Sequence, residues 1–453
     1  MLHKIKILFS GNKLGRTHLM FKNVILSFFT KGGIAVIGIL MVPMMLQLLS
    51  KEEFGIWQTL SSMLGWLYFL DIGLSNGFKN LFTQAIAEKQ IEKANKFLST
   101  TYAIIIFTSL FFVLVFECVN PFLDWGKILN FNQSSIPNFP IIIQLVFLSF
   151  ALKLALSILN TALASNQQYS ASTVIELITQ ICIIGFLYFL IQVKWPSLFM
   201  VAMISSIAPI VLLVLASVYY FNVGSLSVYR PTWRNVDLVL SGQLFSKGVQ
   251  FFFIQIAFVL MFTANNIIVA QLFGPEQVAE LSVVSKYYSI PIMAFVIVLG
   301  PFWAGFTEAY YKNEISWVQI TIKRLLAIWV LFLLLIWTMY WFFEPISMFW
   351  LGNHFKASSK LVFYYAVFAS VVTFNNIFSY FLNGIGKIRV QLIGAIFLGI
   401  ISIPLSVYFC NLPFFEADGV LVANIVCLLL GVVLGPLQYY LIITKKAKGV
   451  WLK

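Results

Sequence analysis

Long apolar runs of about twenty residues, separated by short polar breaks, constrain this chain more than any other feature of its sequence. A helix of about 20 residues crosses the roughly 30 Å hydrocarbon core of a bilayer. Hydrophobic residues make up 60% of the chain and charged residues only 10%, so the charged amphipathic helices that would cover a soluble core are missing. The runs do not alternate as β-barrel strands do. The sequence therefore predicts an all-α, polytopic membrane protein.

We expect about twelve transmembrane helices in two sets of six. The first set lies at about residues 23–49, 54–86, 97–120, 139–164, 170–191 and 198–221. The second set lies at about residues 242–273, 276–311, 317–343, 359–383, 387–411 and 417–444. This division gives a cytoplasmic N-terminal segment (1–22), an N-lobe (23–221), a cytoplasmic connector (222–241), a C-lobe (242–444) and a cytoplasmic basic tail (445–453). The first run is too long for a signal-peptide core and is expected to span the membrane.

The distribution of Lys and Arg predicts the orientation of the chain. With twelve spans, both termini lie on one side, and that side holds 20 of the 29 basic residues. The opposite loops hold five, and the remaining four fall inside spans. Basic residues collect on the cytoplasmic side of membrane proteins, so both termini are expected to be cytoplasmic. The net charge of +13 follows from this topology and does not indicate a nucleic-acid partner.

The two halves of the chain show signs of duplication. Residues 47–52, QLLSKE, align with residues 271–276, QLFGPE, at an offset of 224. The dipeptide Leu159-Asn160 aligns with Leu382-Asn383 at an offset of 223. The order and similar spacing of these matches favour two six-helix lobes in parallel repeat, with the substrate path between them.

The sequence lacks the residue patterns of an enzyme or a metal protein. Its extracytoplasmic loops are short and carry no paired acid and base, and no phosphate-binding loop, nucleophile elbow or metal motif occurs. The four cysteines lie in or beside apolar runs without ligand spacing and are expected to act as small hydrophobic residues. We therefore predict no catalytic residues, no cofactor and no metal site.

Charged residues inside the spans are the candidate functional groups, because such residues are costly in lipid and usually face protein or a wet cavity. Four lysines fall in the middle or the cytoplasmic half of their predicted spans: Lys31, Lys153, Lys247 and Lys286. The alternative is snorkelling, in which a lysine stem carries its ammonium to the headgroups. That alternative applies best to Lys247 and Lys153, whereas Lys31 and Lys286 are expected to be deepest. Asp71 precedes a glycine-rich stretch in the second span and is expected to pair with a lysine.

Several segments resemble a known family. The resemblance lies in FGIW (54–57), LGW (64–66), DIGLSNG (71–77), STTY (99–102) and PFWAGFTEAY (301–310). They are similar to the second helix, the following loop and the eighth helix of bacterial polysaccharide flippases. These are the O-unit (Wzx-type) transporters of the multidrug/oligosaccharidyl-lipid/polysaccharide exporter (MOP) superfamily.

The resemblance implies a fold and a function. It implies a MATE-like fold that moves undecaprenyl-pyrophosphate-linked oligosaccharide across the bacterial inner membrane by alternating access. It implies as partners that lipid-linked substrate, membrane lipids and other polysaccharide-assembly proteins. It also implies a central cavity lined by helices one, two, seven and eight, which carry Lys31, Asp71, Lys247 and Lys286. The alternatives are a cation-coupled multidrug exporter on the same fold, and a membrane glycan ligase or polymerase.

Overall fold

The structure, a computed structural model, describes residues 14–67, 74–133, 136–166, 168–244, 264–311, 313–352 and 355–452. Helices dominate these residues, and no strand occurs among them. Ten of the described helices are long and apolar enough to cross a membrane. The predicted all-α, multi-pass class is confirmed.

The ten apolar helices coincide with ten of the twelve predicted spans. The other two predicted spans, 54–86 and 242–273, contain residues 68–73 and 245–263, which lie outside the described residues. Helices α3 (Lys51–Leu67) and α4 (Leu74–Ala87) flank the first of these stretches, and the short apolar helix α12 (Ala264–Phe273) follows the second.

The described chain forms two compact units. Unit 1 comprises residues up to Leu49, Leu67–Leu123 and Ser134–Phe252, and unit 2 comprises Ser50–Trp66, Asp124–Gln133 and Phe253–Lys453. These units resemble the predicted lobes except that two segments of the N-terminal half join unit 2. The division into lobes at residues 221 and 242 stays a prediction.

Unit 1 is a bundle of helices held by side-chain contacts within the span region. Besides α4, its helices are α2 (Leu14–Leu48), α5 (Ile91–Val119), α7 (Phe139–Leu156), α8 (Ile158–Ser165), α9 (Tyr169–Gln192) and α10 (Leu198–Asn222). Helix α2 packs along α9, where the hydroxyl of Thr30 donates to that of Thr173 at 2.8 Å. Helix α5 packs against α7 through stacked rings of Phe116 and Phe147, with centroids 4.3 Å apart.

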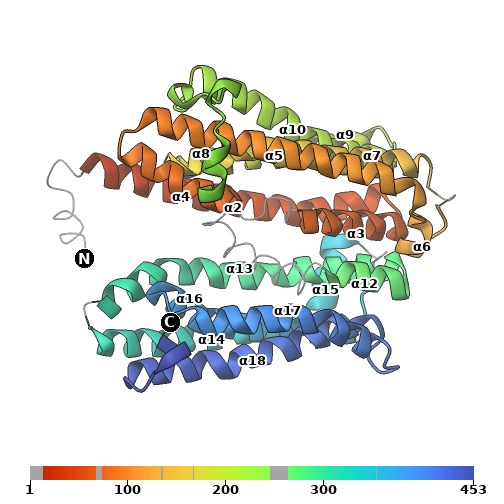
Figure 1. The fold of residues 1–453 in the computed structure, drawn as a ribbon. Coiled ribbons are helices and arrows are strands. Elements are labelled where there is room, and N and C mark those ends of the chain that lie inside the picture. Colours follow the sequence, from red (N-terminus) through yellow and green to blue (C-terminus); the bar gives the residue numbers. More distant parts are fainter. Residues whose placement is uncertain are drawn as a thin grey trace. The chain divides into compact units, whose positions relative to one another are not determined.

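Unit 2 contains α3, the short α6 (Trp125–Leu129), α12 and a larger set of helices, which Figure 1 shows in green to blue. The members of this larger set are α13 (Pro275–Tyr311), α14 (Ile315–Trp341), α15 (Phe343–Leu351), α16 (Ser359–Ile385), α17 (Arg389–Cys410) and α18 (Gly419–Ile443). Helix α13 packs along α16, where the rings of Tyr288 and Tyr365 stack. Trp329 on α14 donates its indole N–H to the hydroxyl of Thr373 on α16 at 3.2 Å.

Candidate functional site

Lys286 lies near the middle of a membrane span. It is 11 residues after Pro275, the first residue of α13, or about 16 Å along the helix axis. Its side chain is exposed, as are those of Ser285 and Ser289, and the Ser289 hydroxyl donates to the Lys286 carbonyl at 2.7 Å. The next two residues, Tyr287 and Tyr288, are buried in the core of unit 2. Helix α13 therefore has a polar face that carries a cation at the depth predicted from the sequence.

Lys31 is also exposed, and it lies in the middle of α2. Helix α2 extends 17 residues, about 26 Å, on either side of it. Its depth within the membrane stays a prediction, and a lysine there can serve a cavity or reach the headgroups by extending its stem.

Lys153 is half-buried and deep. It lies 14 residues after Phe139 and 12 before Ser165, about 21 and 18 Å from the two ends of that span. Its carbonyl accepts the backbone N–H of Ser157, where α7 gives way to α8. The structure therefore places Lys153 as far from either end of its span as Lys286.

The remaining predicted site residues, Asp71 and Lys247, lie outside the described residues. The side chain of Glu308 also falls outside the described side chains. Of the three lysines that are described, Lys31 and Lys153 belong to unit 1 and Lys286 to unit 2. The predicted pairing of Asp71 with a lysine stays a prediction.

Sequence reasoning missed an ion pair between two helix starts of unit 2. The ammonium of Lys51 on α3 lies 2.6 Å from the Oε1 atom of Glu280 on α13. The Glu280 side chain is 13% exposed and that of Lys51 is 35% exposed, so the pair is partly shielded from water. The sequence placed Lys51 in a loop and Glu280 at the end of a span, but 229 residues separate them and no pattern linked the two.

Two further contacts hold α3 in unit 2. The Asn266 amide of α12 donates to the Ser62 hydroxyl of α3 at 2.6 Å. Gly55 on α3 lies directly against the backbone of Pro275, at the start of α13, and a Cβ atom placed on Gly55 would overlap the Pro275 carbonyl group. The ion pair, the close backbone approach and the hydrogen bond follow one another along α3.

Asp418, at the start of α18, is a buried acid that the sequence reasoning also missed. It is 9% exposed, and its carboxylate experiences the charges of Glu280 and Lys360. The only sequence indication was a pair of acids, Glu416 and Asp418, directly before the last apolar run. Among the described residues no group of three His, Cys, Asp or Glu residues could hold a metal ion.

Outside the spans, Asp124 forms a local ion pair that caps α6. Its Oδ1 atom accepts the backbone N–H of Lys127 at 3.1 Å, and its Oδ2 atom lies 3.1 Å from the Lys127 ammonium. These interactions, the backbone hydrogen bond first, lower the pKa of Asp124 below its ordinary value.

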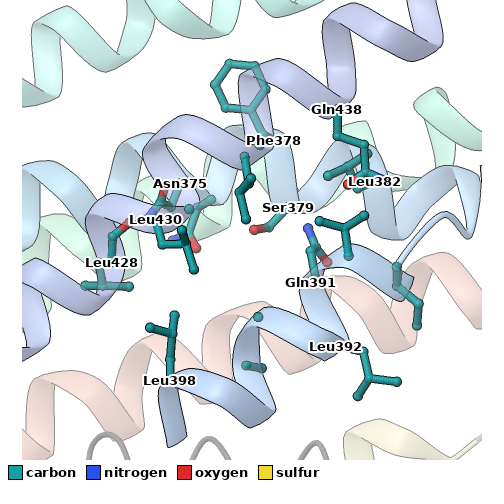
Figure 2. Close-up of a pocket in the computed structure, with 18 of the residues that line it drawn as sticks. Asn375, Phe378, Ser379, Leu382, Gln391, Leu392, Leu398, Leu428, Leu430 and Gln438 are labelled. Atoms are coloured by element: carbon teal, nitrogen blue, oxygen red, sulfur yellow. Dashed lines mark hydrogen bonds between the residues drawn. The ribbon is translucent and has the colours of Figure 1, made fainter. Parts of the chain in front are cut away.

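Unit 2 also contains a cavity of about 460 Å³ between α16, α17 and α18, drawn in Figure 2. Its described lining residues are uncharged and mostly apolar, with a few amide and hydroxyl side chains. The cavity lies within one unit and contains none of the predicted lysines.

Comparisons with known proteins agree with this architecture. A family model described as polysaccharide biosynthesis protein matches residues 20–301, more than half of the chain. No curated protein matches the sequence significantly.

Several solved structures share the fold. An inward-facing multidrug resistance MATE family transporter of the MOP superfamily matches with a TM-score of 0.75 at 12% identity, over 91% of this chain and 96% of that chain. An outward-facing structure of such a transporter gives a TM-score of 0.63 at 12% identity, over 94% and 96% of the two chains. A MOP superfamily transporter from Pyrococcus furiosus, described as having a binding pocket of reverse polarity, gives 0.58 at 12% identity, over 95% of each chain. The predicted MATE-like fold is confirmed.

Proposed function

The chain belongs to the polysaccharide biosynthesis protein family, and from this premise we propose that it is a flippase for lipid-linked oligosaccharides. The proposed substrate is an undecaprenyl-pyrophosphate-linked repeat unit of a surface glycan. The proposed reaction is its transfer from the cytoplasmic to the periplasmic leaflet of the bacterial inner membrane, with no covalent chemistry. The family match, together with a polytopic fold shared with transporters, carries this proposal.

A substrate of this kind needs a cation within the membrane, and Lys286 meets that need. Its exposed side chain lies near the middle of the candidate span Pro275–Gly300, and in a low-dielectric region a pyrophosphate gains more from a positive charge than it would in bulk water. Lysine provides that charge without imposing a fixed geometry on a moving ligand. We propose Lys286 as the principal pyrophosphate contact.

Other lysines extend this proposed path. We propose Lys31 on α2 as an entry contact, and Lys153 and Lys247 as further cations along the substrate route. Asp71 is proposed to hold one of these lysines when no substrate is bound. Both termini are proposed to be cytoplasmic, which puts the N-terminal end of α2 on the side of the membrane where lipid-linked precursors are assembled.

The experiment that tests the proposed function uses a bacterial host whose own flippase for one glycan has been deleted. We expect the intact chain to restore surface glycan and to remove the lipid-linked precursor that accumulates at the cytoplasmic leaflet. Failure to restore any of a panel of glycans, combined with export of cationic dyes from the same cells, would reject the flippase and favour the multidrug exporter.

Variants of Lys286 test its proposed role in the same cells. Lys286→Ala is expected to lose about 1–3 kcal/mol of substrate binding, roughly tenfold or more in affinity, whereas Lys286→Arg keeps the charge and most of the function. Lys194→Ala is the matched control, because Lys194 lies in a loop between α9 and α10. Equal glycan levels in Lys286→Ala and Lys194→Ala cells, at equal protein amounts, would remove Lys286 from the substrate path.

A further inference from the structure

The cavity between α16, α17 and α18 has the dimensions and walls of a small-molecule site. Its volume of about 460 Å³ lies within the range of roughly 300–1,000 Å³ typical of ligand pockets. Such pockets are mostly apolar with a few convergent polar groups. Leu392, Leu398, Leu428 and Leu430 represent the apolar walls here, and no charged residue is among the described residues that line the cavity.

Four uncharged polar side chains converge on this cavity. Asn376, Ser379 and Asn383 recur at helical spacing on α16, so they lie on one face of that helix. Gln391 lines the cavity from α17, and Figure 2 labels it and Ser379 among the side chains around the space. Within the described part of the chain these four side chains have no hydrogen-bond partner.

Unpaired amides and hydroxyls are unfavourable inside a membrane-spanning region, where lipid offers no hydrogen bonds. Asparagines in such helices commonly pair with a neighbouring helix. Asn375 does so, because its amide donates to the Leu428 carbonyl of α18 at 2.9 Å. Its neighbours Asn376, Ser379 and Asn383 instead face the open space, so a bound molecule or water must satisfy them.

The polar side chains of the cavity form a stripe along α16 that extends from near its end toward the middle of the membrane. Asn383 lies two residues before the end of α16 and Gln391 two residues after the start of α17, each about 3 Å from its helix end. Asn376 is about 14 Å from the end of α16, as deep as Leu398 is in α17. The leucines of α17 and α18 form the apolar wall opposite this stripe.

We propose that this cavity binds an uncharged amphiphile, namely a lipophilic alcohol. Its hydroxyl lies between Ser379 and Gln391, and its hydrocarbon body extends along Leu398 and Leu428. A hydroxyl donates one hydrogen bond and accepts others, which suits amide and hydroxyl side chains that provide both donors and acceptors. The uncharged walls offer no counter-ion, so a pyrophosphate or an ammonium group is excluded. This site is independent of the proposed lysine path.

Photolabelling of the intact chain in lipid nanodiscs tests this proposal. The probe is a long-chain alcohol with a photoreactive diazirine in its chain, and the comparison probe is the matching diazirine alkane without the hydroxyl. We expect saturable labelling of α16, α17 or α18 by the alcohol, located by mass spectrometry, and weaker labelling by the alkane. Gln391→Leu approximately keeps the side-chain volume. It is expected to weaken labelling by the alcohol probe roughly three- to tenfold and to leave labelling by the alkane probe unchanged.

A pair of glycine variants provides a matched control. Gly394 lines the cavity on α17, and a Cβ atom there would meet nothing within 4 Å, so Gly394→Phe is expected to fill the cavity and abolish labelling. Gly185 on α9 has equally open surroundings in unit 1, so Gly185→Phe should label like the wild type. Non-saturable labelling, equal labelling by alcohol and alkane, or an unaffected Gly394→Phe variant would overturn the proposal and leave water as the only occupant. Gln391→Leu decides the question if Gly394→Phe does not fold.

Discussion

Gly55→Ala is expected to separate α3 from the start of α13. The added methyl carbon has no room, because it would overlap the Pro275 carbonyl and approach the Pro275 Cα atom to 3.1 Å. A carbon needs about 3.3 Å or more from a carbonyl oxygen, and both atoms here are backbone and cannot rotate away. The helices must therefore move apart, and this motion also disturbs the Lys51–Glu280 ion pair and the Asn266–Ser62 hydrogen bond.

The expected size of the effect follows from these contacts. Forced overpacking costs about 1–3 kcal/mol. Loss of a partly exposed ion pair adds about 1 kcal/mol, and loss of the hydrogen bond adds a similar amount. Alanine regains about 1 kcal/mol over glycine through its higher helix propensity. The net destabilisation of Gly55→Ala is therefore about 2–4 kcal/mol.

The matched control is Gly185→Ala. It has the same change in helix propensity, but its new methyl group meets nothing within 4 Å, so it should be neutral or slightly stabilising. Thermal unfolding of the purified chain in detergent, followed by the loss of monodisperse protein, compares the two variants. Equal thermal midpoints for Gly55→Ala and Gly185→Ala would show that α3 does not pack against α13 as the structure describes.

Three further predictions address charge and topology. Lys51→Met and Glu280→Gln should each destabilise the protein by about 1–2 kcal/mol. In a double-mutant cycle measured by the same thermal assay, the double variant should lose less stability than the sum of the two single losses. Additive losses would show that the two side chains do not interact. Because its folded-state pKa is lowered, Asp124 stabilises the protein above its unfolded pKa of about 4, and this stabilisation disappears as the pH falls through the folded value. In a plot of thermal midpoint against pH, Asp124→Asn should therefore reduce the fall in midpoint at acid pH. An unchanged fall would contradict the stabilising interaction of Asp124 with Lys127. A reporter active only in the periplasm, fused after Lys453, should be silent, whereas strong activity would show an odd number of spans.

The sequence could predict the fold class and the places of most spans, because a bilayer requires long apolar helices regardless of tertiary contacts. The predicted span 170–191 corresponds to α9 at Tyr169–Gln192, and the predicted span 198–221 to α10 at Leu198–Asn222. The depth of Lys286 was also predictable, since it depends only on counting residues from a well-marked helix start. Lys31 lies in the middle of α2, which extends from Leu14 to Leu48, and its depth in the membrane stays a prediction.

The sequence could not predict contacts made by residues far apart in the chain. Asp418 resembled an ordinary acid at a helix start, and it is the packing of residues 416–418 against α12, α16 and α17 that surrounds it. The cavity in unit 2 was invisible for a similar reason. Asn376, Ser379 and Asn383 share one face of α16, but only the packing of α17 and α18 against that helix forms the space that they line.

The duplication predicted from two short sequence matches gains support from the helix boundaries. Helices α5 and α14 begin at Ile91 and Ile315, 224 residues apart, and α10 and α18 begin at Leu198 and Gly419, 221 residues apart. Sequence similarity fades faster than the lengths of helices and turns, because the bilayer keeps constraining those lengths. Superposition of the two halves on each other is the direct test.

The same duplication explains why a segment of the N-terminal half packs into unit 2. Lys51, the first residue of α3, corresponds at the offset of 224 to Pro275, the first residue of α13. Gly55 meets Pro275, so the first turns of two repeat-related helices lie against each other. Two equivalent helix starts can approach this closely only if one of them lacks a side chain at the contact. Glycine at position 55 and the charge pair beside it therefore make the contact specific, although neither half of the chain predicts it alone.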